Sequence, residues 1–270
     1  MKFAEQRERA GKVLASAIKD GADGERIGED LFGVSDLLES NAPLRENLTE
    51  PSRLDTDKVT LLKSLFAAHC TDTTMEVLED LVKQHWSSSH ALVEVTSDLG
   101  LDAYIYQAVQ DGQCADLAQQ LMNASALISD QRELRVQLSD IGKGKPEDRA
   151  NLARAIFQGK VCPIAERLIV RAAFSTHYGQ LLLTLRHYAS RVAELNGRRL
   201  VVAYTATPLD EEQYDKLRQL ASRRWHTDVL LTTVVQPDLI GGFRLDAGEQ
   251  SVDTTVRRDL RVARESLTRA

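Results

Sequence analysis

The stretch LLLTLRHYASRVAELNGRRLVVAYT, residues 181–205, changes its hydrophobic period at Asn196-Gly197. Before this point the apolar side chains recur at helical spacing, at Leu181, Leu185, Tyr188, Val192 and Leu195. After it, the run Leu200–Thr205 is apolar and rich in residues that favour strands. Asn-Gly commonly ends a helix. The chain is therefore predicted to be helical before residue 196 and to contain a small sheet after it.

Earlier parts of the chain repeat the helical spacing. Three further stripes are Ile27, Leu31, Val34 and Leu38; Val59, Leu62, Leu65 and Phe66; and Leu117, Leu121, Ala124 and Ile128. Short polar or glycine-rich and proline-rich breaks separate them, at Asp20-Gly21, Glu50-Pro51, Asp111-Gly112 and 142–146. Each amphipathic helix must bury its apolar face against another helix. This part of the sequence therefore predicts a helical bundle.

The helical part shows an internal correspondence. Asp20-Gly21 corresponds to Asp111-Gly112, and the apolar residues around each pair correspond as well. After small shifts confined to loops, the pairs are Ile27 with Leu117, Leu31 with Leu121, Leu37 with Leu127, Leu44-Arg45 with Leu134-Arg135, Leu48 with Leu138, and Leu65-Phe66 with Ile156-Phe157. A duplicated structural unit tolerates such shifts. The alternative is that any two amphipathic bundles align this well.

The last part of the chain predicts a small β-α-β-β-α unit. Strands are expected at 200–205, 229–235 and 243–247, and a helix from the capping box of Asp210 and Gln213 to about Arg224. Gly248-Glu249 predicts a tight turn before Ser251-Val252. Asp253 is a good N-cap for a last helix with Val252, Val256, Leu260 and Leu267 on one face.

The predicted fold class is therefore mainly α, a helical bundle in two tandem copies followed by the small α/β domain. The expected domains are residues 1–95 for the first helical copy, 96–195 for the second, and 196–270 for the C-terminal domain.

Composition and charge exclude several classes of protein. The 34 basic and 40 acidic residues give a net charge of −6, which argues against a nucleic-acid binder that depends on overall charge. No run approaches the ~20 apolar residues of a membrane span, and Met1–Arg7 lacks the apolar core of a secretory signal. Cys70, Cys114 and Cys162 form no CxxC pair, which favours reduced thiols. A cytosolic protein is expected unless a partner holds it at a membrane.

No residue pattern predicts a catalytic, cofactor or metal site. Gly241-Gly242 lacks the GxGxxG spacing, and no Walker lysine follows it. The six histidines show no HExxH spacing, and no serine stands in GxSxG. Gly142–Lys145 is basic, but an inter-helix connector explains it as well as an anion site does. We therefore expect neither an enzyme nor a bound cofactor.

One run near the end of the chain resembles a known family. Residues 237–248, PDLIGGFRLDAG, with Val252-Asp253 and Val256-Arg257 after them, are similar to the C-terminal signature of F-type ATP synthase delta subunits, which include the oligomycin-sensitivity-conferring protein. The signature residues here are Pro237, Leu239, Ile240, Gly241, Gly242, Gly248, Asp253, Val256, Arg257 and Leu260. Thr254 and Thr255 depart from it, and Phe243-Arg244 is less apolar than usual. The resemblance spans most of the chain and is strongest over residues 200–268.

This resemblance implies a structural role in proton-driven ATP synthesis. The family's helical domain binds N-terminal segments of the alpha subunits at the top of the catalytic head, and its C-terminal domain meets the end of the b-type peripheral stalk. Such a stator subunit resists the torque of the rotor and carries out no chemistry. The resemblance also implies a location on the cytoplasmic face of the cell membrane, with membrane contact only through the complex, and no nucleic-acid partner.

The chain departs from most of the family in length, because it has two helical copies where relatives have one. The second copy joins the C-terminal domain directly, so we expect residues 96–195 to hold the alpha segment.

Two other functions compete with this interpretation. A generic helical scaffold or regulatory adaptor would only imitate the signature. A nucleic-acid-binding adaptor would use Arg257, Arg258, Arg261, Arg264 and Arg269. The absence of interleaved aromatic residues among these arginines weighs against it.

Overall fold

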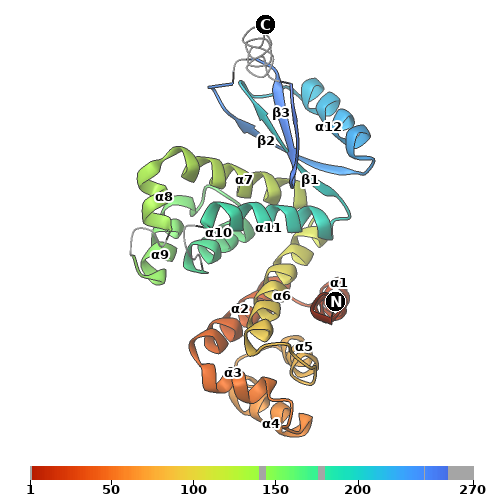
Figure 1. Cartoon of the computed structure of the whole chain (residues 1–270), viewed down its shortest axis with the longest axis vertical. Coiled ribbons are helices and arrows are strands. Elements are labelled where there is room, and N and C mark those ends of the chain that lie inside the picture. The colour runs from red at the N-terminus through yellow and green to blue at the C-terminus, as the bar shows by residue number, and fades with distance from the viewer. Residues whose placement is uncertain (1, 140–143, 176–179, 240, 255–270) are drawn as a thin grey trace, which may run out of the picture. The chain divides into compact units, whose positions relative to one another are not determined.

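The computed structural model describes residues 2–139, 144–175, 180–239 and 241–254. The chain divides into two compact units, Met1–Asp111 and Gly112–Ala270. Figure 1 shows the elements of both units, and each unit is treated separately below. The predicted division at residue 95 falls within helix α6, Ser89–Gln110. The three-domain organisation stays a prediction.

In its described residues, the first unit consists of helices joined by turns and loops. Its helices are α1 (Lys2–Lys19), α2 (Gly24–Ser40), α3 (Ala42–Thr49), α4 (Asp55–Phe66), α5 (Asp72–Val82) and α6 (Ser89–Gln110). α6 packs against α1, α2, α3 and α5. The predicted stripe of α2, from Ile27 to Leu38, is completely buried in this core.

α2 and α6 approach closely because glycine stands where they meet. A Cβ atom at Gly28 would lie 2.5 Å from the ring of Tyr104, and one at Gly100 would lie 2.8 Å from the ring of Phe32. The rings of Phe32 and Tyr104 are stacked, with their centroids 5.8 Å apart. Two large aromatic side chains thus fill the space that the glycines leave, as dense core packing requires.

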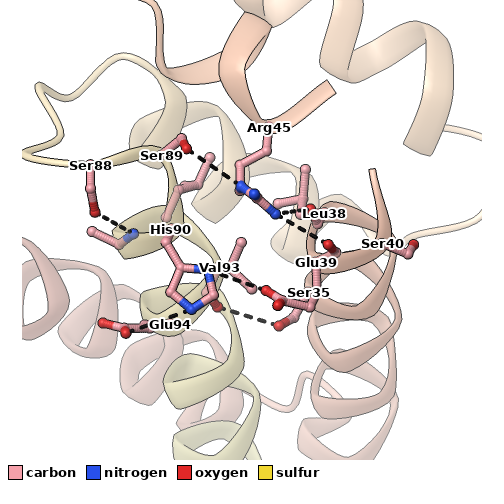
Figure 2. A network of polar contacts seen from close by, with 12 residues as sticks. Ser35, Leu38, Glu39, Ser40, Arg45, Ser88, Ser89, His90, Val93 and Glu94 are labelled. Carbon is pink, nitrogen blue, oxygen red and sulfur yellow. Dashed lines mark hydrogen bonds and ion pairs between the residues drawn. The ribbon is translucent and has the colours of Figure 1, made fainter. Parts of the chain in front are cut away.

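A polar network fastens the end of α2 to α3 and α6 (Figure 2). Nη1 of Arg45 donates to the carbonyl oxygens of Leu38 (2.9 Å) and Glu39 (3.1 Å), which α2 leaves unpaired at its C-terminus. Nε of the same arginine lies 3.4 Å from Oγ of Ser89. His90 lies 3.3 Å from a carboxylate oxygen of Glu39. The short helix α3 buries only Leu48 and Thr49. The contacts of Arg45 therefore help to hold it against α2 and α6.

The second unit joins five helices to a four-stranded sheet. The helices before the sheet are α7 (Cys114–Asp130), α8 (Arg132–Leu138), α9 (Pro146–Phe157), α10 (Pro163–Ser175) and α11 (Leu181–Leu195). The sheet part contains β1 (Arg199–Thr205), α12 (Glu211–Trp225), β2 (Val229–Val235), β3 (Phe243–Ala247) and β4 (Gln250–Asp253). Together with the first unit, these elements confirm the mainly α fold with a small α/β part.

The strand order is β2-β1-β3-β4, with β1 and β2 parallel and the other pairs antiparallel. Alternate side chains of the strands point to the two faces of the sheet. One face packs against α12 and includes Val201, Ala203, Leu231 and Leu245. α7 packs along β2 in the same unit. The strands predicted at 229–235 and 243–247 have the predicted bounds.

The end of the sheet differs from the prediction. Val252 and Asp253, which were assigned to the last helix, lie in a fourth strand, where Val252 pairs with Leu245 and Asp253 pairs with Arg244. Gly248 has a φ of 63°, so the turn Gly248-Glu249 closes a two-residue hairpin and the chain continues along β3. Asp253 therefore belongs to a strand, and the helix that it was predicted to cap falls on residues, from 255 onward, that the structure does not describe.

Under the predicted alignment, α2 to α6 correspond in order to α7 to α11. One set of hydrogen bonds at the start of a helix also occurs in both units. Oδ2 of Asp30 in α2 accepts the N–H of Thr71 at 2.7 Å, and Oε1 of Gln120 in α7 accepts the N–H of Cys162 at 2.7 Å. Thr71 and Cys162 each cap the following helix, since the N–H groups of Thr74 and Ala165 approach their side chains. Asp30 and Gln120 fall at equivalent positions of the predicted alignment, and the later pairs continue it with the same offset as Leu65-Phe66 and Ile156-Phe157. The arrangement supports a duplication.

Candidate functional site

The predicted signature residues begin in the connection between β2 and β3. The N–H of Gln236 donates to the carbonyl oxygen of Thr205 at 2.7 Å, which closes the end of the parallel pair before Pro237 turns the chain. Leu239 is half-buried, and Gly241 and Gly242 lead into β3. The connection therefore passes the carboxyl end of β1, where the chain leaves for α12.

Both glycines have left-handed backbone conformations. Their φ angles are 65° at Gly241 and 74° at Gly242. A side chain in this region costs roughly 1–2 kcal/mol per residue, so two successive positions of this kind favour glycine strongly. The pair thus has a structural explanation, and it also keeps side chains away from the surface beside α12.

α12 forms the opposite wall of this surface. Its start is fixed by a capping box, in which Oδ1 of Asp210 accepts the N–H of Gln213 at 2.8 Å and Oε1 of Gln213 accepts the N–H of Asp210 at 3.1 Å. Leu217 packs into the core of the sheet, whereas Leu220 is 44% exposed. One side chain of the helix therefore faces the core and another remains at the surface.

Between these walls lies an open groove of about 430 Å³. Its apolar lining includes Ala206, Leu209, Leu217, Leu220 and Phe243, with Gly241 and Gly242 at one side. Lys216 stands in the lining and forms an ion pair with Glu212. An open apolar groove with a charged residue beside it suits the apolar face of a partner helix better than a buried small molecule.

The structure brings only part of the predicted set to this groove. Gly241 and Gly242 line it, whereas Gly248 lies in the hairpin between β3 and β4 and Asp253 lies in β4. Ile240, Val256, Arg257 and Leu260 lie outside the described residues. The part of these residues in partner binding stays a prediction.

Sequence reasoning missed the side chains that make the groove apolar. Leu209, Leu217, Leu220 and Phe243 come from three separate segments, and the fold brings them together. One local signal was available. Leu217 and Ala221 form the buried face of α12. Leu220 lies outside this face, and an exposed leucine of this kind indicates a surface that could contact a partner.

The titratable groups of the described residues offer little nucleophilic chemistry. Burial, with a smaller contribution from Asp30, raises the pKa of the Cys70 thiol to about 11. Burial also raises the pKa of Cys114. Both thiols are therefore protonated near neutral pH, and the thiolate is the reactive form. Within the described ranges, no three His, Cys, Asp or Glu side chains gather as metal ligands would. The helices described there include none that could span a membrane.

Comparison with known proteins identifies the relatives of the chain. Residues 102–267 match the family model described as ATP synthase delta (OSCP) subunit. The chain is 31% identical to the ATP synthase subunit delta of Bifidobacterium longum subsp. infantis over 245 residues, which are 90% of this chain and 88% of the relative. It is 31% identical to that of Beutenbergia cavernae over 94% of this chain and 93% of the relative. The protein of the same name from Frankia alni is 27% identical over 94% of each chain.

Proposed function

Because this chain belongs to the ATP synthase delta (OSCP) subunit family, a family of non-catalytic stator components, we propose that it joins two particular partners. The groove beside α12 receives the end of the b-type stalk. The second helical series, α7 to α11, receives the N-terminal segment of an alpha subunit. The subunit lies on the cytoplasmic face of the cell membrane within the complex. It resists the torque of the rotor through affinity and stiffness.

The observation that carries the stalk assignment is the apolar groove at the carboxyl end of β1. Leu220 stays 44% exposed although an alanine or a polar residue would serve an isolated helix surface equally well. Together with Leu209 and Phe243 it offers an apolar anchor site in the lining of the groove. Anchors of this kind contribute most of the free energy when an amphipathic helix binds.

The alpha segment is assigned to the second helical series for a different reason. The family model begins at residue 102 and ends at residue 267. It therefore includes α7 to α12 and omits most of the first helical series, α1 to α6. A partner shared by the whole family should bind to the part that the whole family shares. The longer matches to the Beutenbergia and Frankia proteins, over 94% of the chain, extend into the first series. That series is an addition shared with such relatives.

Calorimetry on the full chain tests both assignments. Two probes are titrated, the C-terminal segment of the b-type subunit and the N-terminal segment of the alpha subunit from the same organism. Leu220→Glu places a charge in the groove and should weaken stalk binding at least about tenfold while alpha binding is unchanged. Leu54→Glu is the matched control, because Leu54 is 69% exposed in the first unit. Equal stalk affinity for both variants would contradict the groove assignment.

A further inference from the structure

Gln119 of α7 joins the helical series of the second unit to the sheet through a pair of directed hydrogen bonds. Its Nε2 donates to the carbonyl oxygen of Thr233 at 2.7 Å, and its Oε1 accepts the N–H of the same residue at 2.8 Å. The side-chain amide thus meets both polar groups of one β2 residue. Nε2 also donates to Oδ1 of Asn123, one turn further along α7, at 2.8 Å.

The location of Thr233 gives this contact its importance. β2 is at the edge of the sheet, and β1 is its neighbour on the other side. The N–H and C=O of Thr233 therefore point to an open edge, where unpaired backbone groups invite pairing with another chain. A glutamine amide carries the donor and acceptor of a peptide group. Gln119 thus occupies the place of one residue of a further strand.

The rest of the contact between helices and sheet is less specific. Leu230 and Val234 of β2 are buried, but a hollow of about 160 Å³ remains between α7, the start of α11 and the sheet, lined by Met122, Ser125 and Tyr204 among others. Oγ1 of the buried Thr232 has no hydrogen-bond partner among the described residues. Apolar contact is non-directional. The two bonds of Gln119 therefore add a directed contact to this joint.

The first helical series provides a comparison. By the alignment of α2 with α7, the residue that corresponds to Gln119 is Glu29. Its carboxylate accepts the hydroxyl of Tyr104 at 2.6 Å, within a unit whose described residues include no β-strand. A carboxylate has no donor for a carbonyl oxygen, so Glu29 does not have the hydrogen-bonding groups for this pairing. Glutamine is thus found in the second helical series, which packs against the sheet, and glutamate in the first.

We infer that Gln119 is a positioning residue that fixes the orientation of the sheet on the second helical series and transmits load between them. This inference rests on the proposed function, in which the alpha segment and the stalk bind to these two parts. Torque between the partners then passes through the joint. Loss of the directed pair should leave each binding surface intact and make their connection more compliant.

The test uses Gln119→Met, which retains the approximate size of the side chain and removes both hydrogen bonds. Asn123→Ala is the control, because it leaves both bonds to Thr233 in place. Hydrogen exchange at the Thr233 amide in the full chain should accelerate about tenfold in Q119M, as expected for loss of one net hydrogen bond, and remain unchanged in N123A. Unchanged exchange in Q119M would overturn the inference. If Q119M does not fold, Gln119→Glu retains the side-chain length and removes the donor.

The functional arm uses the reconstituted ATP synthase. Proton-driven ATP synthesis should fall with Q119M while ATP hydrolysis and the affinities for both partner segments persist, and N123A should resemble the natural chain. Faster exchange at Thr233 with undiminished synthesis would overturn the role of Gln119 in transmitting load and leave the proposed function standing. Failure of the natural chain to bind either segment would instead overturn the proposed function.

Discussion

Tyr104 of α6 lies directly against Gly28 of α2, so closely that a Cβ atom at residue 28 would come within 2.5 Å of the tyrosine ring. Tyr104 is only 1% exposed, and its hydroxyl donates to Glu29 at 2.6 Å. The ring therefore has no free space to move into. The contact sets the distance between α2 and α6 in the core of the first unit.

Gly28→Ala should consequently destabilise the first unit. Overpacking a core costs about 1–3 kcal/mol, which exceeds the gain of about 1 kcal/mol in helix propensity when alanine replaces glycine. The net effect should lower the free energy of unfolding by up to about 2 kcal/mol. Urea denaturation followed by circular dichroism measures it.

Gly33 on the same helix provides the control. No described heavy atom outside its own helix lies within 4 Å of a Cβ atom built there. Gly33→Ala should therefore raise the free energy of unfolding by up to about 1 kcal/mol. If both variants were stabilising, the close contact between α2 and α6 would be disproved.

A second prediction concerns Arg7, which bridges two acids of α6. It lies 2.6 Å from Asp98 and 3.1 Å from Asp102, and the side chain of Asp102 is only 1% exposed. Arg7→Met would remove the guanidinium that pairs with this buried carboxylate, at a cost of about 3 kcal/mol. The midpoint of thermal unfolding should fall clearly.

Arg9, two residues later, forms an ion pair that is much more exposed. Its side chain is 70% exposed and lies 2.8 Å from Asp80. Arg9→Met should change the free energy of unfolding by less than about 1 kcal/mol. Similar losses for the two variants would show that burial of Asp102 does not decide the effect.

Local sequence patterns predicted those elements that have a strong signal of their own. The run Val229–Val235 is apolar, rich in β-branched residues and followed by Pro237, so its bounds were correct. β4 was missed because Gln250 and Ser251 are polar and exposed. β4 is a strand because it pairs with β3 across a two-residue turn. The local sequence of residues 250–253 alone does not indicate this pairing.

The candidate sites depend still more on the fold. Gln119 and Thr233 are 114 residues apart in sequence, and neither belongs to a motif. Leu209 and Phe243 meet Leu220 only after β1, α12 and β3 have assembled. By contrast, the pair Gly241-Gly242 is visible in the sequence as a backbone turn before β3, and both residues have the left-handed conformations that favour glycine.

Cys70 gives a prediction that depends on pH. Burial, and to a smaller degree Asp30, raises the pKa of its thiol to about 11 from an ordinary value of 9.0. At pH 9 only ~1% is then thiolate in the folded chain, against about half in the unfolded chain. Iodoacetamide should therefore label Cys70 roughly 50-fold more slowly in the native chain than in denaturant.

The raised pKa of Cys70 also makes the free energy of unfolding depend on pH. Because the folded state binds this proton more tightly than the unfolded state, Cys70 favours folding fully below pH 9, and this contribution is lost as the pH rises towards 11. Cys70→Ala should remove that part of the alkaline decline. Equal labelling rates in native and denatured chains, measured by mass spectrometry of the Cys70 peptide, would contradict the raised pKa.

The final prediction uses the repeated helix starts at Thr71 and Cys162. The N–H of Thr74 lies 3.3 Å from Oγ1 of Thr71, whereas the N–H of Ala165 lies 3.5 Å from the sulfur of Cys162. Sulfur is a weak acceptor, and serine is a preferred N-cap residue. Cys162→Ser should therefore stabilise the second unit by about 0.5–1 kcal/mol, while Thr71→Ala should destabilise the first by about 1 kcal/mol. Chemical denaturation of both variants measures these differences, and destabilisation by Cys162→Ser would show that the two positions are not equivalent caps.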